Sequence, residues 1–149
     1  MDIQEKLYKT IKNNDINNVE LLLKNEKVNP SKDTNYSIRL ASKNGFFDIV
    51  KLLLNDKRVD PSKYDNWAIQ VASENGQLDI VKLLLKDTRV DPSDYNNVSI
   101  IKASQNGYFD IINLLWKDKR VKTSLKEDCF ELYEILIKKD KIKENIEDF

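Results

Sequence analysis

The chain has 149 residues, of which 40% are hydrophobic and 34% are charged. This length fits one domain, and the high charged fraction favours an elongated fold that exposes more surface than a sphere. Lys plus Arg and Asp plus Glu number 25 each, so no net field draws the chain to nucleic acid or to an anionic membrane, and we expect neither as a partner.

The residue types restrict the chemistry further. Histidine is absent and Cys129 is the single cysteine, so we expect no disulfide framework, no metal site and no cofactor. A lone cysteine favours a reducing compartment, and we therefore expect a cytoplasmic or nuclear, intracellular location. No stretch approaches the ~20 apolar residues of a membrane helix, and the polar residues 1–15 do not resemble a secretory signal.

The first part of the chain, residues 1–31, is a degenerate copy of a unit that recurs further on. Val19, Val28 and Pro30 are in register with the later copies, while Asn14 stands where those copies have a glycine. Asparagine also tolerates the left-handed backbone conformation. Because the end units of a repeat array meet water on their outer face, such departures are expected of an N-terminal capping repeat.

Three full copies follow, over residues 32–62, 63–93 and 94–124. They contain the segments NYSIRLASKNGFFDIVKLLLNDKRVDPS, NWAIQVASENGQLDIVKLLLKDTRVDPS and NVSIIKASQNGYFDIINLLWKDKRVKTS, in a constant step of 31 residues. A constant step of this size predicts a solenoid, in which equivalent residues of successive copies are neighbours.

Each copy is predicted to form two antiparallel helices. The first helix has an asparagine just ahead of it as the candidate N-cap and ends at a glycine that suits the left-handed conformation. The second helix opens with an aspartate, which is favoured at the positive end of the helix dipole. A turn with proline, serine and aspartate leads to the next copy. These landmarks are Asn35, Asn66 and Asn97, then Gly45, Gly76 and Gly107, then Asp48, Asp79 and Asp110.

Residues 125–149 leave the register, and we expect them to form a C-terminal capping helix. Ser124 and Glu127 have the spacing of a capping box. Trp116 replaces a leucine of the earlier copies and is expected to pack against this cap, while Cys129 is expected to be a small buried apolar side chain. The apolar residues of the cap fall along one helical face: Leu125, Cys129, Leu132, Leu136 and Ile137.

The stretches LASKNGFFDIVKLLL, VASENGQLDIVKLLL and KASQNGYFDIINLL resemble the ankyrin repeat, and the resemblance covers nearly the whole chain. It implies an all-α, ankyrin-type repeat solenoid of about four helix pairs, joined by short hairpin-like loops and followed by the capping helix, in one domain over residues 1–149. The unit is shorter than the usual ~33 residues. The Thr-Pro-Leu-His that opens the family's first helix is replaced at residues 36–39, 67–70 and 98–101, so its Thr–His network is not expected.

The VDPS loop, the DIVKLLL helix and the wealth of Lys, Asn and Ile also resemble ankyrin proteins encoded by giant DNA viruses of amoebae. AT-rich coding favours the same residues in many intracellular parasites and amoebae, so more than one origin fits this composition. A viral or parasitic origin would place the protein in a host cell, acting on a host factor.

The family's usual binding surface is its concave face, made of first helices and loop tips, and the resemblance therefore implies a protein–protein interaction module. Tyr64 and Tyr95 lie in the middle of polar loops and are the best candidate anchors. Trp67 either faces the partner or staples neighbouring loops. The candidate partner-binding residues are Tyr36, Arg39, Lys43, Tyr64, Asp65, Trp67, Gln70, Glu74, Tyr95, Asn96, Ile101 and Gln105.

Two other columns of equivalent residues are interpreted as structural. The first is a ladder of basic residues that could bind anions, but nearby aspartates are expected to compensate its charge along the solenoid edge. The second is a column of large apolar residues that we expect in the core. The ladder is Lys27, Arg58, Arg89 and Arg120, with Asp56, Asp87 and Asp118, and the apolar column is Phe47, Leu78 and Phe109.

The sequence shows no catalytic constellation, since it has no phosphate-binding loop, no histidine base and no activated serine motif, and we expect that the protein is not an enzyme. We expect a monomer that binds another protein. The alternatives are a structural or self-assembling ankyrin protein, and a substrate adaptor for a ubiquitin-ligase machine in which the C-terminal segment is the docking element.

Overall fold

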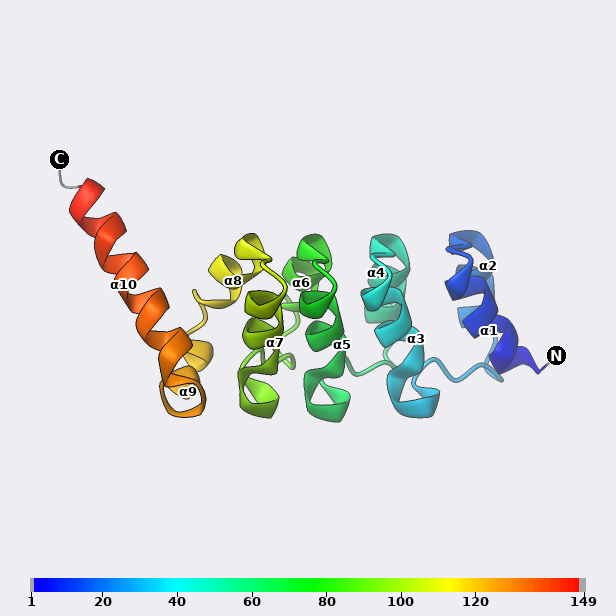
Figure 1. The fold of residues 1–149 in the computed structure, drawn as a ribbon. Coiled ribbons are helices and arrows are strands. Elements are labelled where there is room, and N and C mark those ends of the chain that lie inside the picture. The colour runs from blue at the N-terminus through cyan, green and yellow to red at the C-terminus, as the bar shows by residue number, and fades with distance from the viewer. Residues whose placement is uncertain (1, 148–149) are drawn as a thin grey trace.

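The computed structural model describes residues 2–147, and the side chains of residues 2–142. Over residues 2–147 the chain forms ten helices and no strand, placed side by side in one elongated row (Figure 1). The all-α repeat solenoid predicted from the sequence is confirmed. The helices are α1 (Ile3–Lys12), α2 (Ile16–Leu23), α3 (Lys32–Lys43), α4 (Phe47–Asn55), α5 (Lys63–Glu74), α6 (Leu78–Leu84), α7 (Asp94–Gln105), α8 (Phe109–Leu115), α9 (Lys119–Asp128) and α10 (Phe130–Glu147).

The helices form two layers, which we name the first helices (α1, α3, α5 and α7) and the second helices (α2, α4, α6 and α8). Each first helix packs against its own second helix and against the first helices of the neighbouring repeats. One hydrophobic cluster runs through the whole row. Its side chains are equivalent from repeat to repeat, as in Ile38, Ile69 and Ile100, which are all 0% exposed. The repeats therefore share one continuous core.

The ends of the helices follow the local signals in the sequence. Gly45, Gly76 and Gly107 have φ angles of 77°, 72° and 74°, and Asn14, in the equivalent place of the first copy, has a φ of 54°. A left-handed residue there ends the first helix and turns the chain toward the second. The aspartates predicted for the second helices lie in their first turns. Both predictions are confirmed.

The first helices begin differently from the prediction. Residues 33–35, 64–66 and 95–97 all have positive φ values between 51° and 63°, so a left-handed turn precedes each regular helix. Asn35, Asn66 and Asn97 end these turns and do not cap the helices. Their side chains are 3%, 4% and 0% exposed, because each points into the junction with the following repeat.

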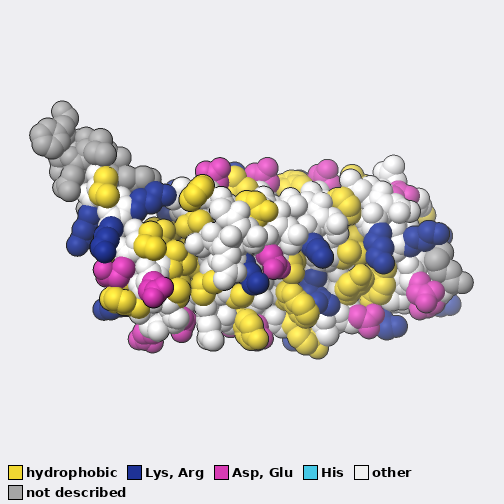
Figure 2. All heavy atoms as spheres, viewed as in Figure 1, with side chains coloured by type: hydrophobic (Ala, Val, Ile, Leu, Met, Phe, Trp, Pro, Cys, Tyr) yellow, Lys and Arg dark blue, Asp and Glu magenta, His cyan; other side chains and the backbone are white. Residues whose placement is uncertain are grey.

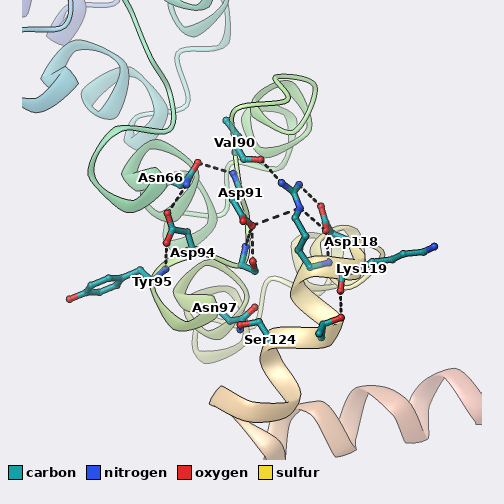
Figure 3. A network of polar contacts seen from close by, with 12 residues as sticks. Asn66, Val90, Asp91, Asp94, Tyr95, Asn97, Asp118, Lys119 and Ser124 are labelled. Atoms are coloured by element: carbon teal, nitrogen blue, oxygen red, sulfur yellow. Dashed lines mark hydrogen bonds and ion pairs between the residues drawn. The ribbon is translucent and has the colours of Figure 1, made fainter.

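The three asparagines donate to residues 25 to 31 positions further along the chain, at the junction with the next repeat. Asn35 Nδ2 donates to the backbone oxygen of Asp60 at 2.9 Å. Asn66 Nδ2 donates to the carboxylate of Asp94, and its Oδ1 accepts from the backbone N–H of Asp91, both at 2.9 Å (Figure 3). The third member of this asparagine ladder, Asn97, donates to Ser124 Oγ at 2.7 Å and to an Asp128 oxygen at 2.8 Å, both in α9. Each buried amide thus orients one unit against its successor.

The predicted compensation of the basic ladder is confirmed, and it also links repeats. Arg58, Arg89 and Arg120 form ion pairs with the aspartates two residues earlier, at 2.5, 2.6 and 2.7 Å. Each guanidinium also donates from Nη1 to a backbone oxygen of the preceding repeat, at 2.7, 3.2 and 3.1 Å respectively. Such a forked contact suits the planar guanidinium group. These residues therefore fasten neighbouring repeats at the edge of the row.

We expect the stabilisation that these Asp–Arg ion pairs provide to be lost at acidic pH. Hydrogen bonds from the arginines hold the pKa values of Asp56, Asp87 and Asp118 below their usual range. A carboxyl group with a lowered folded-state pKa stabilises the fold above its unfolded pKa of about 3.9, and this contribution is lost as the pH falls through the folded-state value. The free energy of unfolding, obtained from urea titrations between about pH 7 and pH 3, should decline less steeply for Asp87→Asn than for the wild type. The difference should reach about 1 kcal/mol at most, because the ion pair is partly exposed. Parallel curves for the variant and the wild type would contradict this account.

The C-terminal cap consists of two helices, and the prediction of a single helix starting at Ser124 is wrong. Ser124 lies inside α9, where its Oγ donates to Asp128 at 2.6 Å. The chain breaks at Cys129, which has φ −149° and ψ 73° and is half-buried. Leu125 in α9 and Leu136 in α10 are both buried. The break lets both helices cover the end of the core, and α10 then leaves the row at an angle (Figure 1).

Trp116 packs against this cap as predicted. It is 5% exposed, and its indole N–H donates to Asp140 of α10 at 2.7 Å. Its ring also meets Tyr133 edge-on, with 5.8 Å between the ring centres.

The apolar column that was expected in the core is largely exposed. Phe47 is 41% exposed and Phe109 is 68% exposed, while Leu78 is half-buried against the core. These residues occupy the first position of the second helices. Because helical side chains tilt toward the N-terminus of their helix, a residue at this position projects past the end of the core.

Candidate functional site

The surface formed by the exposed sides of the first helices and the left-handed turns, which we name the first-helix face, carries most of the candidate residues. Tyr64, Trp67 and Tyr95 are 54%, 41% and 63% exposed on it. Figure 2 views the molecule from the side on which α5 lies in front of α6, and it shows hydrophobic side chains interspersed with charged ones. In Figure 3 the ring of Tyr95 points away from the polar network of the junction. This face therefore presents aromatic rings to solvent.

A row of aromatic and basic side chains crosses three successive repeats. The ring centres of Tyr8 and Tyr36 lie 4.9 Å apart, edge to face. The guanidinium carbon of Arg39 lies 5.7 Å from the centre of the Tyr36 ring and 4.0 Å from that of Trp67. A cation over a ring face is attracted by the ring's negative face. Trp67 is thus held by the preceding repeat and still leaves part of its ring in solvent.

Tyr8 is a member of this row that the sequence prediction missed. Its hydroxyl donates to the Asp33 carboxylate at 2.8 Å. Burial, followed by this hydrogen bond, raises the pKa of Tyr8 to about 12, so the group is a neutral donor at physiological pH. The register contains the signal, because Tyr8 in the first copy is equivalent to Arg39 in the second. The candidate columns begin in the second copy and therefore do not include Tyr8.

Two hollows lie on the first-helix face, on either side of Trp67. The α3/α5 hollow has a volume of about 350 Å³, and the α5/α7 hollow has a volume of about 410 Å³. The first brings together Tyr36, Arg39, Leu40, Lys43, Trp67, Val71 and Glu74. The second brings together Tyr64, Asp65, Trp67, Gln70, Glu74, Tyr95, Val98 and Lys102.

The remaining candidates do not line either hollow. Asn96 and Gln105 are exposed elsewhere, and Ile101 is half-buried against the core. Lys102, by contrast, was missed and lines the α5/α7 hollow. Leu40 and Val71 are equivalent to Lys102 in the two preceding copies. A lysine at a position that is apolar in the other copies is the sequence feature that could have indicated it.

Comparison with protein families identifies the repeat. A family model of ankyrin repeats, in three copies, matches residues 7–96 and, in a second alignment, residues 38–127. The chain belongs to the ankyrin repeat family. Ankyrin repeats generally mediate protein–protein interaction, and the family is typically non-catalytic. A comparison with curated proteins found no match.

The two hollows of this ankyrin array differ in charge. The α3/α5 hollow contains the cations of Arg39 and Lys43 and the carboxylate of Glu74. The α5/α7 hollow contains Glu74 and Asp65 but a single ammonium group, that of Lys102, which lies 3.4 Å from Glu74. The face therefore changes from basic to acidic across one repeat.

The described residues contain neither a metal-binding cluster nor a membrane-spanning helix. Within residues 2–142, no group of three or more Asp, Glu or Cys side chains is placed to hold a metal ion. None of the helices in the described range is long and apolar enough to cross a membrane. The first-helix face, with its rings, cations and carboxylates, is suited to non-covalent recognition.

Proposed function

We propose that this ankyrin protein binds a partner protein through its first-helix face and the left-handed turns. The observation that carries the proposal is the gathering of Tyr64, Trp67 and Tyr95 around one hollow, each more than two-fifths exposed. Exposed tyrosine and tryptophan side chains contribute a large share of the binding energy in protein interfaces.

The scaffold beneath these rings supports the same conclusion. Asn66 and Asn97 end the turns that carry Tyr64 and Tyr95, and both are buried and hydrogen-bonded to the next unit. A fixed turn loses little conformational freedom when a partner binds, which favours affinity. The viral resemblance in composition makes a host-cell protein the first partner class to test.

A photo-crosslinking experiment tests the proposal. A benzophenone amino acid is placed at Tyr95 or, as a matched control, at Phe109, which is also exposed but starts a second helix. In lysate of the source cells or of their host, position 95 should give discrete crosslinks to one protein, and position 109 should not. Equal labelling at both positions, or none at Tyr95, would contradict a binding role for this face.

Self-assembly is the second candidate, and one observation favours it. Ile135 and Ile142 on α10 are 63% and 60% exposed, and their spacing of two helical turns puts them on the same side of the helix. Light scattering distinguishes the two functions. A molar mass that stays at the monomer value over a wide concentration range supports binding to a different protein, whereas a defined oligomer supports assembly.

A further inference from the structure

Successive repeats carry equivalent hollows, and in one of them the chain supplies its own cation. In the α3/α5 hollow the guanidinium of Arg39 lies against the rings of Tyr36 and Trp67. Its Nη2 donates to the hydroxyl of Thr34 at 2.7 Å and to the backbone oxygen of Asp33 at 3.0 Å. This hollow therefore shows how the repeat holds a positive charge between aromatic rings.

One repeat later the same positions hold different residues. Gln70 stands in the place of Arg39, and Asp65 stands in the place of Thr34. The amide of Gln70 donates to the backbone oxygen of Asp65, which is one register position beyond the Asp33 oxygen that accepts from Arg39. A hydrogen bond to the turn is thus present in both repeats, but the second lacks the cation, and the Asp65 carboxylate replaces the Thr34 hydroxyl group that accepts from Arg39.

The lining of the α5/α7 hollow favours a cation from outside. Tyr64, Trp67 and Tyr95 supply three partly exposed rings. Among the described residues, the ion pair of Glu74 is with Lys102, and none is formed by Asp65. Ring faces and an uncompensated carboxylate both attract positive charge, and a volume of about 410 Å³ lies within the range of binding pockets.

From this we infer that the α5/α7 hollow receives a cationic side chain, arginine or lysine, presented by the partner protein. The inference rests on the proposed function and specifies its chemistry. The incoming cation lies beside Gln70, near the Trp67 ring and the Asp65 carboxylate that line this hollow.

Small amino-acid probes test this inference directly. The probes are N-acetyl methylamides of arginine, of lysine and of citrulline, which has the shape of arginine without its charge. Binding is followed by NMR through the indole N–H of Trp67, with that of the buried Trp116 as internal reference. At least one cationic probe should shift the Trp67 signal saturably and bind about tenfold more tightly than the citrulline probe.

Two variants and a control locate the effect. Asp65→Asn should weaken binding of the cationic probe about fivefold to tenfold. Gln70→Arg should abolish it, because the new guanidinium places a positive charge of the chain's own beside Asp65, which repels a second cation. Asp110→Asn removes an exposed carboxylate on a second helix and should change nothing. Unfolding midpoints of all three variants establish that they are folded.

The outcomes separate this inference from the proposed function. Equal affinity for the citrulline and arginine probes, no effect of Asp65→Asn, or no saturable shift with either cation overturns the inference. If crosslinks at Tyr95 still identify a partner in that case, the proposed function stands without it. Charge-selective probe binding without any crosslinked partner would instead uphold the cation site and contradict the protein-binding role.

Discussion

Replacing Leu84 by aspartate is expected to unfold the array. Leu84 lies in α6 at the middle of the row and is 0% exposed, as are its equivalents Leu53 and Leu115 in the neighbouring repeats. A carboxylate there would be buried without a partner, and the contacts of the leucine side chain would also be lost. The expected cost exceeds about 4 kcal/mol, a large fraction of the total stability of a small domain. Urea unfolding followed by circular dichroism measures it.

Leu21→Asp is the matched control for this substitution. Leu21 also belongs to a second helix, but it is 65% exposed. The same chemical change there should alter the free energy of unfolding by less than about 0.5 kcal/mol. A urea midpoint of Leu84→Asp close to that of the control would mean that water reaches position 84, and that the repeats do not share a continuous core.

The double variant Tyr64→Ala/Tyr95→Ala is expected to lose partner binding while keeping its fold. Both rings are more than half exposed, so their removal takes little out of the core. Alanine retains the Cβ atom, so the left-handed turns, with φ values of 56° and 52° at these residues, are no more strained than before. Binding of the crosslinked partner, measured by calorimetry, should weaken by about 2 kcal/mol or more, which is about thirtyfold.

The control for this pair is Phe109→Ala, which removes an exposed ring from a second helix. It should leave partner affinity unchanged within about threefold. Thermal unfolding of all variants separates binding from stability. If the tyrosine variant loses stability in proportion to affinity, its rings belong to the folded core and the assignment of the face is wrong.

The parts of the fold that local signals determine could be predicted from the sequence. A glycine between a first and a second helix indicates a left-handed backbone conformation at that residue. The structure has this conformation at Gly45, Gly76 and Gly107. An aspartate three residues after each of these glycines favours the positive end of a helix, and it lies in the first turn of the second helix. Threefold repetition of these signals in one register distinguished them from chance.

The starts of the first helices could not be predicted in the same way. Asparagine before a helix is a common N-cap, yet Asn35, Asn66 and Asn97 bond to residues 25 to 31 positions further on. Nothing local indicates such a partner. The left-handed conformation of tyrosine and threonine in the turns is likewise against local preference. Contacts between repeats decide both features.

The candidate site was predicted in outline. Reading columns at the repeat length led to Arg39, Trp67 and Tyr95, which line the hollows. It could not show that Arg39 stacks on a ring of the next repeat, nor that Ile101 lies partly in the core, because column position does not give the direction of a side chain. The prediction that Phe47 and Phe109 lie in the core is wrong for the same reason. The binding role of these residues stays a prediction.

The asparagine ladder gives the array a direction. Each buried amide donates to residues 25 to 31 positions further along the chain, never to earlier ones, and the last donates to α9. A duplicated internal repeat would therefore contain its own asparagine and also an acceptor for the asparagine of the preceding repeat. Duplication within the gene can lengthen the array while every junction between repeats keeps the same hydrogen bonds. Shortening from the C-terminal end has no such freedom at the cap, since a cut directly ahead of α9 leaves the buried amide of Asn97 without Ser124 and Asp128. Insertion of further repeats therefore preserves the hydrogen bonds of the asparagine ladder, whereas loss of α9 does not.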